Sequence, residues 1–94
     1  MRIHQVIWLR QFVDKLEFKH GVSTDEIEEI LYGKMKMRRI ARGDVHGEDL
    51  YLALGQTTAG RYLAVFFVLK ESQAALPISA RDMDAKERRN YGRK

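Results

Sequence analysis

The chain has 94 residues, a formal net charge of +4 and a sequence pI of about 9.6, and 45% of its residues are hydrophobic. This length suits one compact domain, residues 1–94, with a small core, and the basic balance favours an anionic partner such as nucleic acid, a membrane surface or an acidic protein. The absence of cysteine excludes disulfides, thiolate zinc sites and a cysteine nucleophile.

Targeting and membrane signals are missing from the sequence. The longest purely apolar run, Tyr62 to Leu69, is far shorter than the roughly 20 residues that a membrane-spanning helix needs. His4 and Gln5 interrupt the apolar residues at the N-terminus, so there is no signal-peptide pattern. We therefore expect a soluble, cytoplasmic protein with no membrane partner.

The first 33 residues predict two helices. The first is predicted within residues 3–19, although its leading residues can instead form a short strand, and Gly21 stands where its C-terminal cap belongs. The second begins at Ser23, which forms a capping box with Glu26, and ends near Gly33. The apolar stripe of the first helix consists of Leu9, Phe12, Val13 and Leu16.

Strands follow as far as residue 80. Residues 34–42 alternate methionine with basic residues, which indicates a strand with one solvated, basic side. Glycine-rich or polar turns separate three more predicted strands, over residues 50–56, 61–70 and 74–80. Pro77 cannot donate a ladder hydrogen bond, so we expect an edge position or a bulge there.

The last predicted element is a helix that begins at Asp84, with Glu87 as the reciprocal partner of this cap. Helices at both ends of a run of strands joined by short turns indicate an α+β fold. We expect helices packed on a curved antiparallel sheet of about four strands, followed by a C-terminal helix.

The histidines considered as candidate functional residues are His20, which has two open interpretations, and His46. His20 follows Leu16 by four residues and so is expected to point toward the body of the domain, either as a helix-end histidine bonded to a carbonyl or as a general acid or base. His46 lies in "HGED", which is typical of a polar turn rather than a cation site. No spacing of histidines and acids indicates a metal site, and no serine lies in a nucleophile elbow.

Basic residues cluster in two segments, 34–42 and 81–94. Arginine forks match phosphate oxygens bidentately, and tyrosines that face the same groove can stack on unpaired bases. For any one arginine a solvated charged face is the simpler interpretation, whereas the two clusters together favour anion binding. The tyrosines in question are Tyr51, Tyr62 and Tyr91.

Three motifs resemble the BrnT toxin family of type II toxin–antitoxin systems. They are "KHGVS" (19–23), "GEDLYLALGQTTAGRYLAVFFV" (47–68) and "ISARDMDAKERRNY" (78–91), and Trp8 lies at the family's usual distance before the first of them. The resemblance implies a RelE-like fold, endoribonuclease activity, an RNA substrate that is free or bound to the ribosome, and inhibition by a BrnA-like antitoxin. It implies no cofactor, and homo-oligomers or toxin–antitoxin hetero-oligomers remain open.

The resemblance also points to site residues. A metal-free mechanism by 2′-hydroxyl attack needs proton transfer, assigned to His20, and cations at the phosphoryl group, assigned to Arg61 and Arg81, with Lys19 adding positive field. Glu87 is expected to orient Arg81 or to cap its helix. The expected RNA-binding residues are Lys36, Arg38, Arg88 and Tyr91.

The chain departs from the commoner family pattern in its first helix. Leu9, Phe12 and Leu16 stand where the family usually has an acidic residue, a lysine and an asparagine, and Pro77 replaces a common valine. These departures keep a second interpretation open, in which the chain is a non-catalytic module that binds an antitoxin or a nucleic acid.

Overall fold

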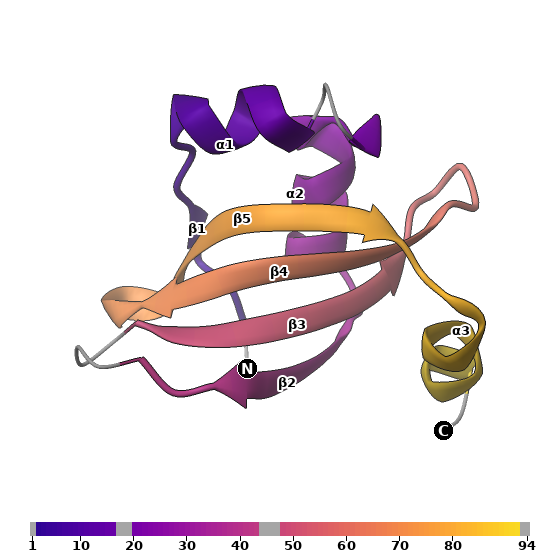
Figure 1. The fold of residues 1–94 in the computed structure, drawn as a ribbon. Coiled ribbons are helices and arrows are strands. Elements are labelled where there is room, and N and C mark those ends of the chain that lie inside the picture. The colour runs from indigo at the N-terminus through magenta and orange to yellow at the C-terminus, as the bar shows by residue number, and fades with distance from the viewer. Residues whose placement is uncertain (1, 17–19, 44–47, 93–94) are drawn as a thin grey trace.

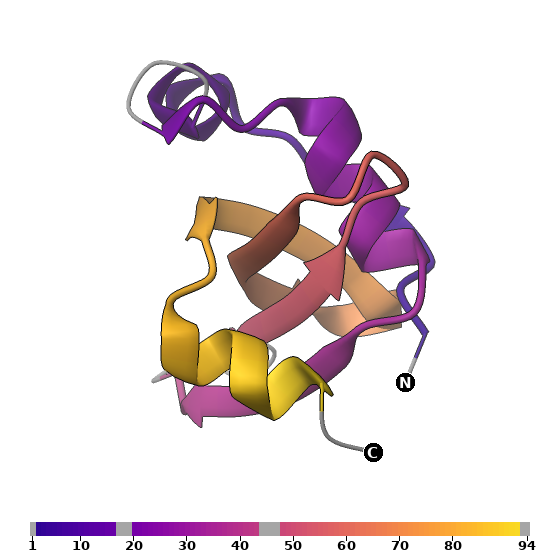
Figure 2. The ribbon, with the colours of Figure 1, turned by 90° about the vertical axis from the view of Figure 1, so that its right-hand side faces the viewer.

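The computed structural model describes residues 2–16, 20–43 and 48–92, which form a five-stranded sheet with helices on both of its sides (Figures 1 and 2). The strand order is β1-β5-β4-β3-β2. The elements in chain order are β1 (Gln5–Val6), α1 (Arg10–Lys15), α2 (Thr24–Tyr32), β2 (Lys36–Ala41), β3 (Asp49–Gln56), β4 (Tyr62–Lys70), a 3₁₀ turn (Glu71–Gln73), β5 (Ala74–Asp82) and α3 (Ala85–Gly92).

The α+β class, the four long strands and the C-terminal helix are confirmed, but the prediction of a purely antiparallel sheet of about four strands is wrong. β1 is a fifth strand, and it pairs with β5 in parallel. The backbone N–H of His4 donates to Gln73 O at 2.9 Å, and that of Ile7 donates to Ala75 O at 2.8 Å. The N-terminal residues thus cover part of an edge of β5 that would otherwise present unpaired backbone groups.

Both helix boundaries near the N-terminus depend on local backbone signals. The alternative that the leading residues form a short strand is confirmed by β1, and α1 is therefore shorter than the range 3–19. Gly21 has a φ of +62°, in the left-handed region where glycine is favoured, but the C-cap of α1 is Leu16, so the prediction that Gly21 caps this helix is wrong. Ser23 accepts the N–H of Glu26 at 3.2 Å and donates its own N–H to the Glu26 carboxylate at 3.0 Å, so the predicted capping box is confirmed.

One face of the sheet carries the main core. Because side chains alternate along a strand, Leu63, Val65 and Phe67 of β4 all point to this face, where they pack against Ile27 and Ile30 of α2. Each of these five side chains is at most 1% exposed. The Trp8 indole N–H also donates to Glu28 of α2 at 2.7 Å, which ties the N-terminal segment to the same layer.

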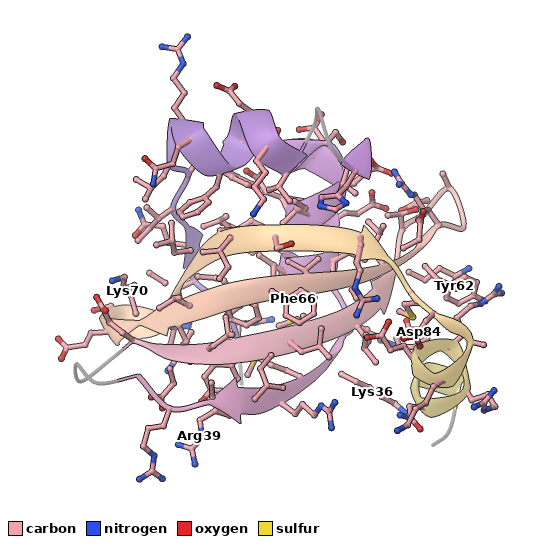
Figure 3. The ribbon with its side chains drawn as sticks, viewed as in Figure 1. Lys36, Arg39, Tyr62, Phe66, Lys70 and Asp84 are labelled. Atoms are coloured by element: carbon pink, nitrogen blue, oxygen red, sulfur yellow. The ribbon has the colours of Figure 1, made fainter. Side chains whose placement is uncertain are left out.

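Among the described residues, the opposite face is covered only at one end, where α3 lies beyond the end of β5 (Figures 1 and 2). A small apolar cluster fills the space there, with Met83 just before α3 and Tyr91 within it. Towards the other end, Phe66 lies on the uncovered part of this face (Figure 3). We call the side of the sheet that carries Phe66 and α3 the open face.

Pro77 lies at a bulge in β5. Phe66 and Phe67 of β4 pair with Ser79 and Pro77, so Ile78 is an extra residue on β5. This confirms one of the two predicted settings for the proline. A bulge tolerates the missing N–H donor and increases the local twist of the strand.

Within the residues that the structure describes, no helix is both long enough and apolar enough to span a membrane.

Candidate nucleic-acid interface

Basic side chains from two strands, β2 and β5, lie on the open face. Lys36 and Arg38 alternate along β2, and the strand register places them on the same face as Leu52 and Leu54 of β3. Ala64 of β4 continues that row, and Arg81 of β5 pairs with it. The basic side predicted for the strand within residues 34–42 is therefore confirmed in β2. It shares a face of the sheet with an arginine more than 40 residues further along the chain.

Arg81 forms a bidentate ion pair with Glu87 of α3. Its two terminal nitrogens donate to the two carboxylate oxygens at 2.6 and 2.8 Å, and its guanidinium carbon lies 5.4 Å from the centre of the Phe66 ring. The hydrogen bonds from Arg81 hold the pKa of Glu87 below its usual value, and the same contact raises the pKa of Arg81. Both groups are therefore charged at neutral pH, and 39% of the arginine side chain remains exposed.

Glu87 also caps its own helix. It accepts the backbone N–H of Asp84 at 2.9 Å while Asp84 accepts the N–H of Glu87 at 2.8 Å, so the predicted capping box is confirmed. One carboxylate thus fixes both the start of α3 and the direction of the Arg81 fork. This geometry agrees with both roles predicted for Glu87.

Aromatic residues flank the arginines at the α3 end of the open face. The guanidinium carbon of Arg88 lies 4.3 Å from the centre of the Tyr62 ring, and Tyr91 contacts that ring edge-on at 6.1 Å. Tyr62 and Lys36 both lie beside α3 (Figure 3). The prediction for Tyr51 is wrong, because its ring stacks on Phe67 in the main core, 5.7 Å between centres.

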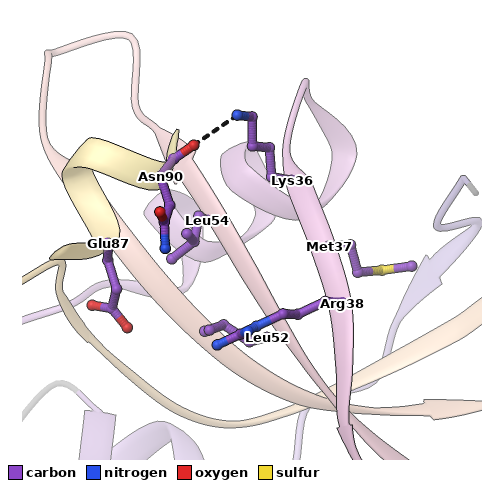
Figure 4. A pocket seen from close by; sticks show the side chains of 7 residues that line it. All are labelled: Lys36, Met37, Arg38, Leu52, Leu54, Glu87 and Asn90. Atoms are coloured by element: carbon purple, nitrogen blue, oxygen red, sulfur yellow. Dashed lines mark hydrogen bonds between the residues drawn. The ribbon is translucent and has the colours of Figure 1, made fainter. Parts of the chain in front are cut away.

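A pocket of about 160 Å³ opens between β2 and α3. Leu52 and Leu54 form its floor, and Lys36 and Arg38 form one wall (Figure 4). The opposite wall is made by α3, through Glu87 and Asn90, and the Lys36 ammonium reaches across to donate to the backbone oxygen of Asn90 at 2.7 Å. An apolar floor, a cationic wall and a polar wall together suit the binding of a planar, polar ring.

Arg61 lies on the other side of the sheet. It lies two residues before Leu63, which points into the main core. Its guanidinium donates to Asp82, which pairs with Leu63. Assigning Arg61 and Arg81 to the same phosphoryl group requires them to share one cleft, and the structure instead places them on opposite sides of the sheet. The physical reason is strand alternation: Asp82, which binds Arg61, directly follows Arg81 and so points to the opposite face.

The Arg61 guanidinium joins three distant segments. It donates to Asp82 at 2.9 Å, to Glu26 at 3.1 and 3.2 Å, and to the carbonyl oxygens of Gly21 and His20 at 2.9 and 3.4 Å. The contact with Asp82 raises the pKa of Arg61, and the arginine in turn lowers the pKa of Asp82. Two carboxylates thus neutralise this cation and hold it in place.

His20 lies beside Arg61 through its backbone, but its side chain is exposed. The expectation that it points toward the body of the domain is wrong, because α1 ends at Lys15, and Leu16 and His20 have π-helical backbone, to which the α-helical spacing does not apply. Lys19 and His46 lie outside the described residues. Of the rest of "HGED", Glu48 pairs with Lys70 at 2.6 Å and Asp49 pairs with Arg39 at 3.3 Å.

Acid titration is expected to destabilise the fold through these pairs. The pKa of Glu87 is lowered by Arg81, and that of Glu26 is lowered by the Ser23 N–H and by Arg61. Because each folded pKa lies below the unfolded value, the unfolded chain binds more protons between the two, so this stability is complete above about pH 4.5 and lost at lower pH. Urea midpoints should fall between about pH 5 and pH 2, and less steeply for Glu87→Gln. Equal pH dependence in parent and variant would contradict this expectation.

The departures in the first helix lie on the far side of the sheet from the open face. Leu16 is 1% exposed and belongs to the main core, whereas Leu9 is 40% exposed. Phe12 is half-buried on α1. None of the three lines the pocket or contacts Arg81, so these substitutions leave the open face unchanged.

Sequence reasoning missed Asn90, Phe66 and the two leucines of the pocket floor. Asn90 carried a usable signal, because it follows Glu87 by three residues and therefore shares a face of α3 with it. The leucines carried none, because alternation along β3 does not say which face of the sheet the terminal helix will cover.

Comparisons with known proteins agree with this fold. The family described as "Ribonuclease toxin, BrnT, of type II toxin-antitoxin system" matches residues 13–87. The crystal structure of the Brucella abortus ribonuclease toxin BrnT superposes with a TM-score of 0.65 at 23% identity, covering 85% of this chain and 96% of that one. Among curated proteins, no significant match is found. Because the family match extends over most of the chain, this protein belongs to the BrnT ribonuclease toxin family of type II toxin–antitoxin systems.

Proposed function

We propose that the chain is an endoribonuclease that cleaves RNA by attack of a ribose 2′-hydroxyl on the adjacent phosphodiester, without a metal ion. The observation that carries the proposal is the Arg81–Glu87 pair on the open face, beside a pocket and further cations. A guanidinium held in a fixed direction and still partly exposed is suited to binding the non-bridging oxygens of a phosphodiester.

Each step of the reaction has a candidate group. As the 2′-oxygen attacks, negative charge grows on the phosphoryl oxygens, and Arg81, already oriented by Glu87, stabilises it without reorganising. The 2′-hydroxyl loses a proton and the 5′-oxygen gains one as the P–O5′ bond breaks, and we assign this proton transfer to His20, with Lys19 adding positive field. His20 lies beside Arg61, which binds Asp82, the residue after Arg81, so the assignment requires the RNA to pass over the end of β5. Arg61 is a positioning residue in this proposal, because it holds the carbonyl oxygens of His20 and Gly21.

Substrate binding is assigned to the rest of the open face. Lys36, Arg38 and Arg88 supply positive charge that attracts the RNA, which makes affinity depend on salt. Tyr91, together with Tyr62, supplies aromatic surface for an unpaired base. Because RNA bases are read mainly in single strands, we propose a single-stranded or loop substrate, free or on the ribosome.

The regulatory context follows from family membership. Toxins of type II systems are held inactive by an antitoxin protein, and we propose a BrnA-like antitoxin as the partner here. The proposal includes a cytoplasmic site of action and a RelE-like ancestry of the fold, with residues 1–94 acting as one domain. The antitoxin can form a hetero-oligomer with the toxin.

A second candidate function is favoured by one specific observation. Arg61 and the backbone of His20 lie away from the face that carries Arg81, and two carboxylates already neutralise Arg61. A non-catalytic module that binds RNA or an antitoxin would need only the open face. Measuring RNA cleavage distinguishes the two functions, whereas measuring RNA affinity does not.

The test is single-turnover cleavage of a labelled single-stranded RNA in excess EDTA. We expect cleavage to persist, to leave 2′,3′-cyclic phosphate ends, and to fall by about 10²-fold or more in His20→Gln. Loss of cleavage in EDTA with recovery in Mg²⁺ would contradict the metal-free mechanism. Tight RNA binding without cleavage, together with no growth arrest on expression, would favour the binding module.

A further inference from the structure

We propose that the pocket between β2 and α3 is a binding site for one unpaired guanine base of the RNA. This inference rests on the proposed function, since it names the base that lies next to the phosphodiester held by Arg81. The pocket, of about 160 Å³, is smaller than the range of about 300–1,000 Å³ typical for drug-sized ligands. It therefore fits a single ring system rather than a whole nucleotide.

The two walls of the pocket differ in hydrogen-bonding character. The β2 wall offers donors only, the Lys36 ammonium and the Arg38 guanidinium, whose chain runs over Leu52 toward α3 (Figure 4). The α3 wall offers acceptors, the carboxylate of Glu87 and the side-chain carbonyl of Asn90. Within the described part of the chain, the Asn90 amide makes no hydrogen bond, and Glu87 Oε2 has Arg81 as its one partner.

Guanine matches these walls better than the other bases. It carries two adjacent acceptors, O6 and N7, on one edge, and two adjacent donors, N1–H and the N2 amino group, on the other. Arginine or lysine against O6 and N7 is the commonest specific contact to this base. Adenine has an amino group where guanine has O6, so it would point a donor at the donors of Lys36 and Arg38.

The pocket is also correctly placed for this role. Glu87 lines it and simultaneously binds Arg81, so the base site and the phosphate site share one side chain. Leu52 and Leu54 supply an apolar floor for the ring, because both belong to the small cluster under α3. A guanine seated here would place its own phosphate within reach of the exposed part of Arg81.

The test is equilibrium binding, by fluorescence anisotropy, of single-stranded RNA pentamers with four uridines and one variable central nucleotide. All five sugars carry a 2′-O-methyl group, so the strand has no free 2′-hydroxyl and cannot be cleaved. Central guanine is expected to bind about 5- to 150-fold more tightly than adenine. Hypoxanthine, which lacks the N2 amino group, should bind less tightly than guanine, and Asn90→Ala should reduce guanine to the level of hypoxanthine.

Arg89→Ala is the matched control. Arg89 neighbours Asn90 on α3, is exposed and does not line the pocket. Its removal should weaken all pentamers by a similar factor and preserve their order. Similar affinities of the parent for guanine and adenine, no measurable binding, or an unchanged preference in Asn90→Ala would each overturn the inference. Because the pentamers are not cleaved, a preference for guanine in a chain that fails to cleave all-ribose RNA would reject the enzyme and keep the base site.

Discussion

Replacing Arg81 with alanine is expected to reduce single-turnover RNA cleavage by about 10²-fold or more. The guanidinium is fixed by the two hydrogen bonds that it donates to Glu87 and is still 39% exposed, so it can stabilise the charge that develops on the phosphoryl group. Arg81→Lys keeps the charge but loses the planar fork, and we expect it to recover only part of the rate. The measurement is the first-order rate constant with enzyme in excess over labelled RNA.

Two controls separate chemistry from folding for Arg81. Arg89→Ala removes an exposed cation from α3, and its rate should stay close to the parent's once the enzyme is saturating. The Arg81 variants leave Glu87, at 13% side-chain exposure, without its partner, so their urea midpoints must be measured alongside. A well-folded Arg81→Ala chain that cleaves RNA at the parent rate would remove Arg81 from the proposed mechanism.

Replacing Arg61 with alanine is expected to lower the free energy of unfolding by about 2–3 kcal/mol, since hydrogen bonds to charged groups contribute about 1.5–3 kcal/mol each and this side chain makes several. Its guanidinium joins the start of α2, the end of β5 and the backbone at Gly21. Removal leaves Glu26 and Asp82 without their cation, and both carboxylates are partly solvated, which limits the loss. Urea unfolding at neutral pH gives the difference.

The matched control for Arg61 is Arg39→Ala. Arg39 pairs with Asp49 at 3.3 Å on the surface, with 45% of its side chain exposed, so its loss should cost only about 0.2–1 kcal/mol. If both variants lose the same small amount, Arg61 does not hold these segments together. Cleavage by Arg61→Ala under conditions where it is fully folded then decides between a positioning role and direct contact with the phosphate.

Local signals were sufficient for most of the elements. Ser23 with Glu26, and Asp84 with Glu87, are capping boxes that depend on residues three apart, and both form as the sequence predicts. The alternation in β2 likewise depends on neighbours in the chain, and its basic side is solvated. The prediction for the direction of His20 assumes α-helical spacing from Leu16, and it is wrong because these two residues have π-helical backbone.

The sequence motifs identified the family, and family membership implied an RNA substrate. The motifs did not predict on which side of the sheet each arginine lies. Arg61 and Arg81 both lie within the quoted motifs, yet Arg61 binds Asp82 on the helix side of the sheet and Arg81 binds Glu87 on the open face. Residue type does not distinguish the two arginines, whereas the register of β4 with β5 does.

The sequence by itself determined the α+β class, the capping boxes, the bulge at Pro77 and the presence of two basic clusters, because each depends on contacts among residues close in the chain. Tertiary structure alone decided that Lys36 and Arg38 meet Arg81, that α3 closes a pocket over Leu52 and Leu54, and that Arg61 is neutralised on the other side. The reason is that strand pairing and helix docking join residues tens of positions apart, and a one-residue change of register would send each of these side chains to the opposite face.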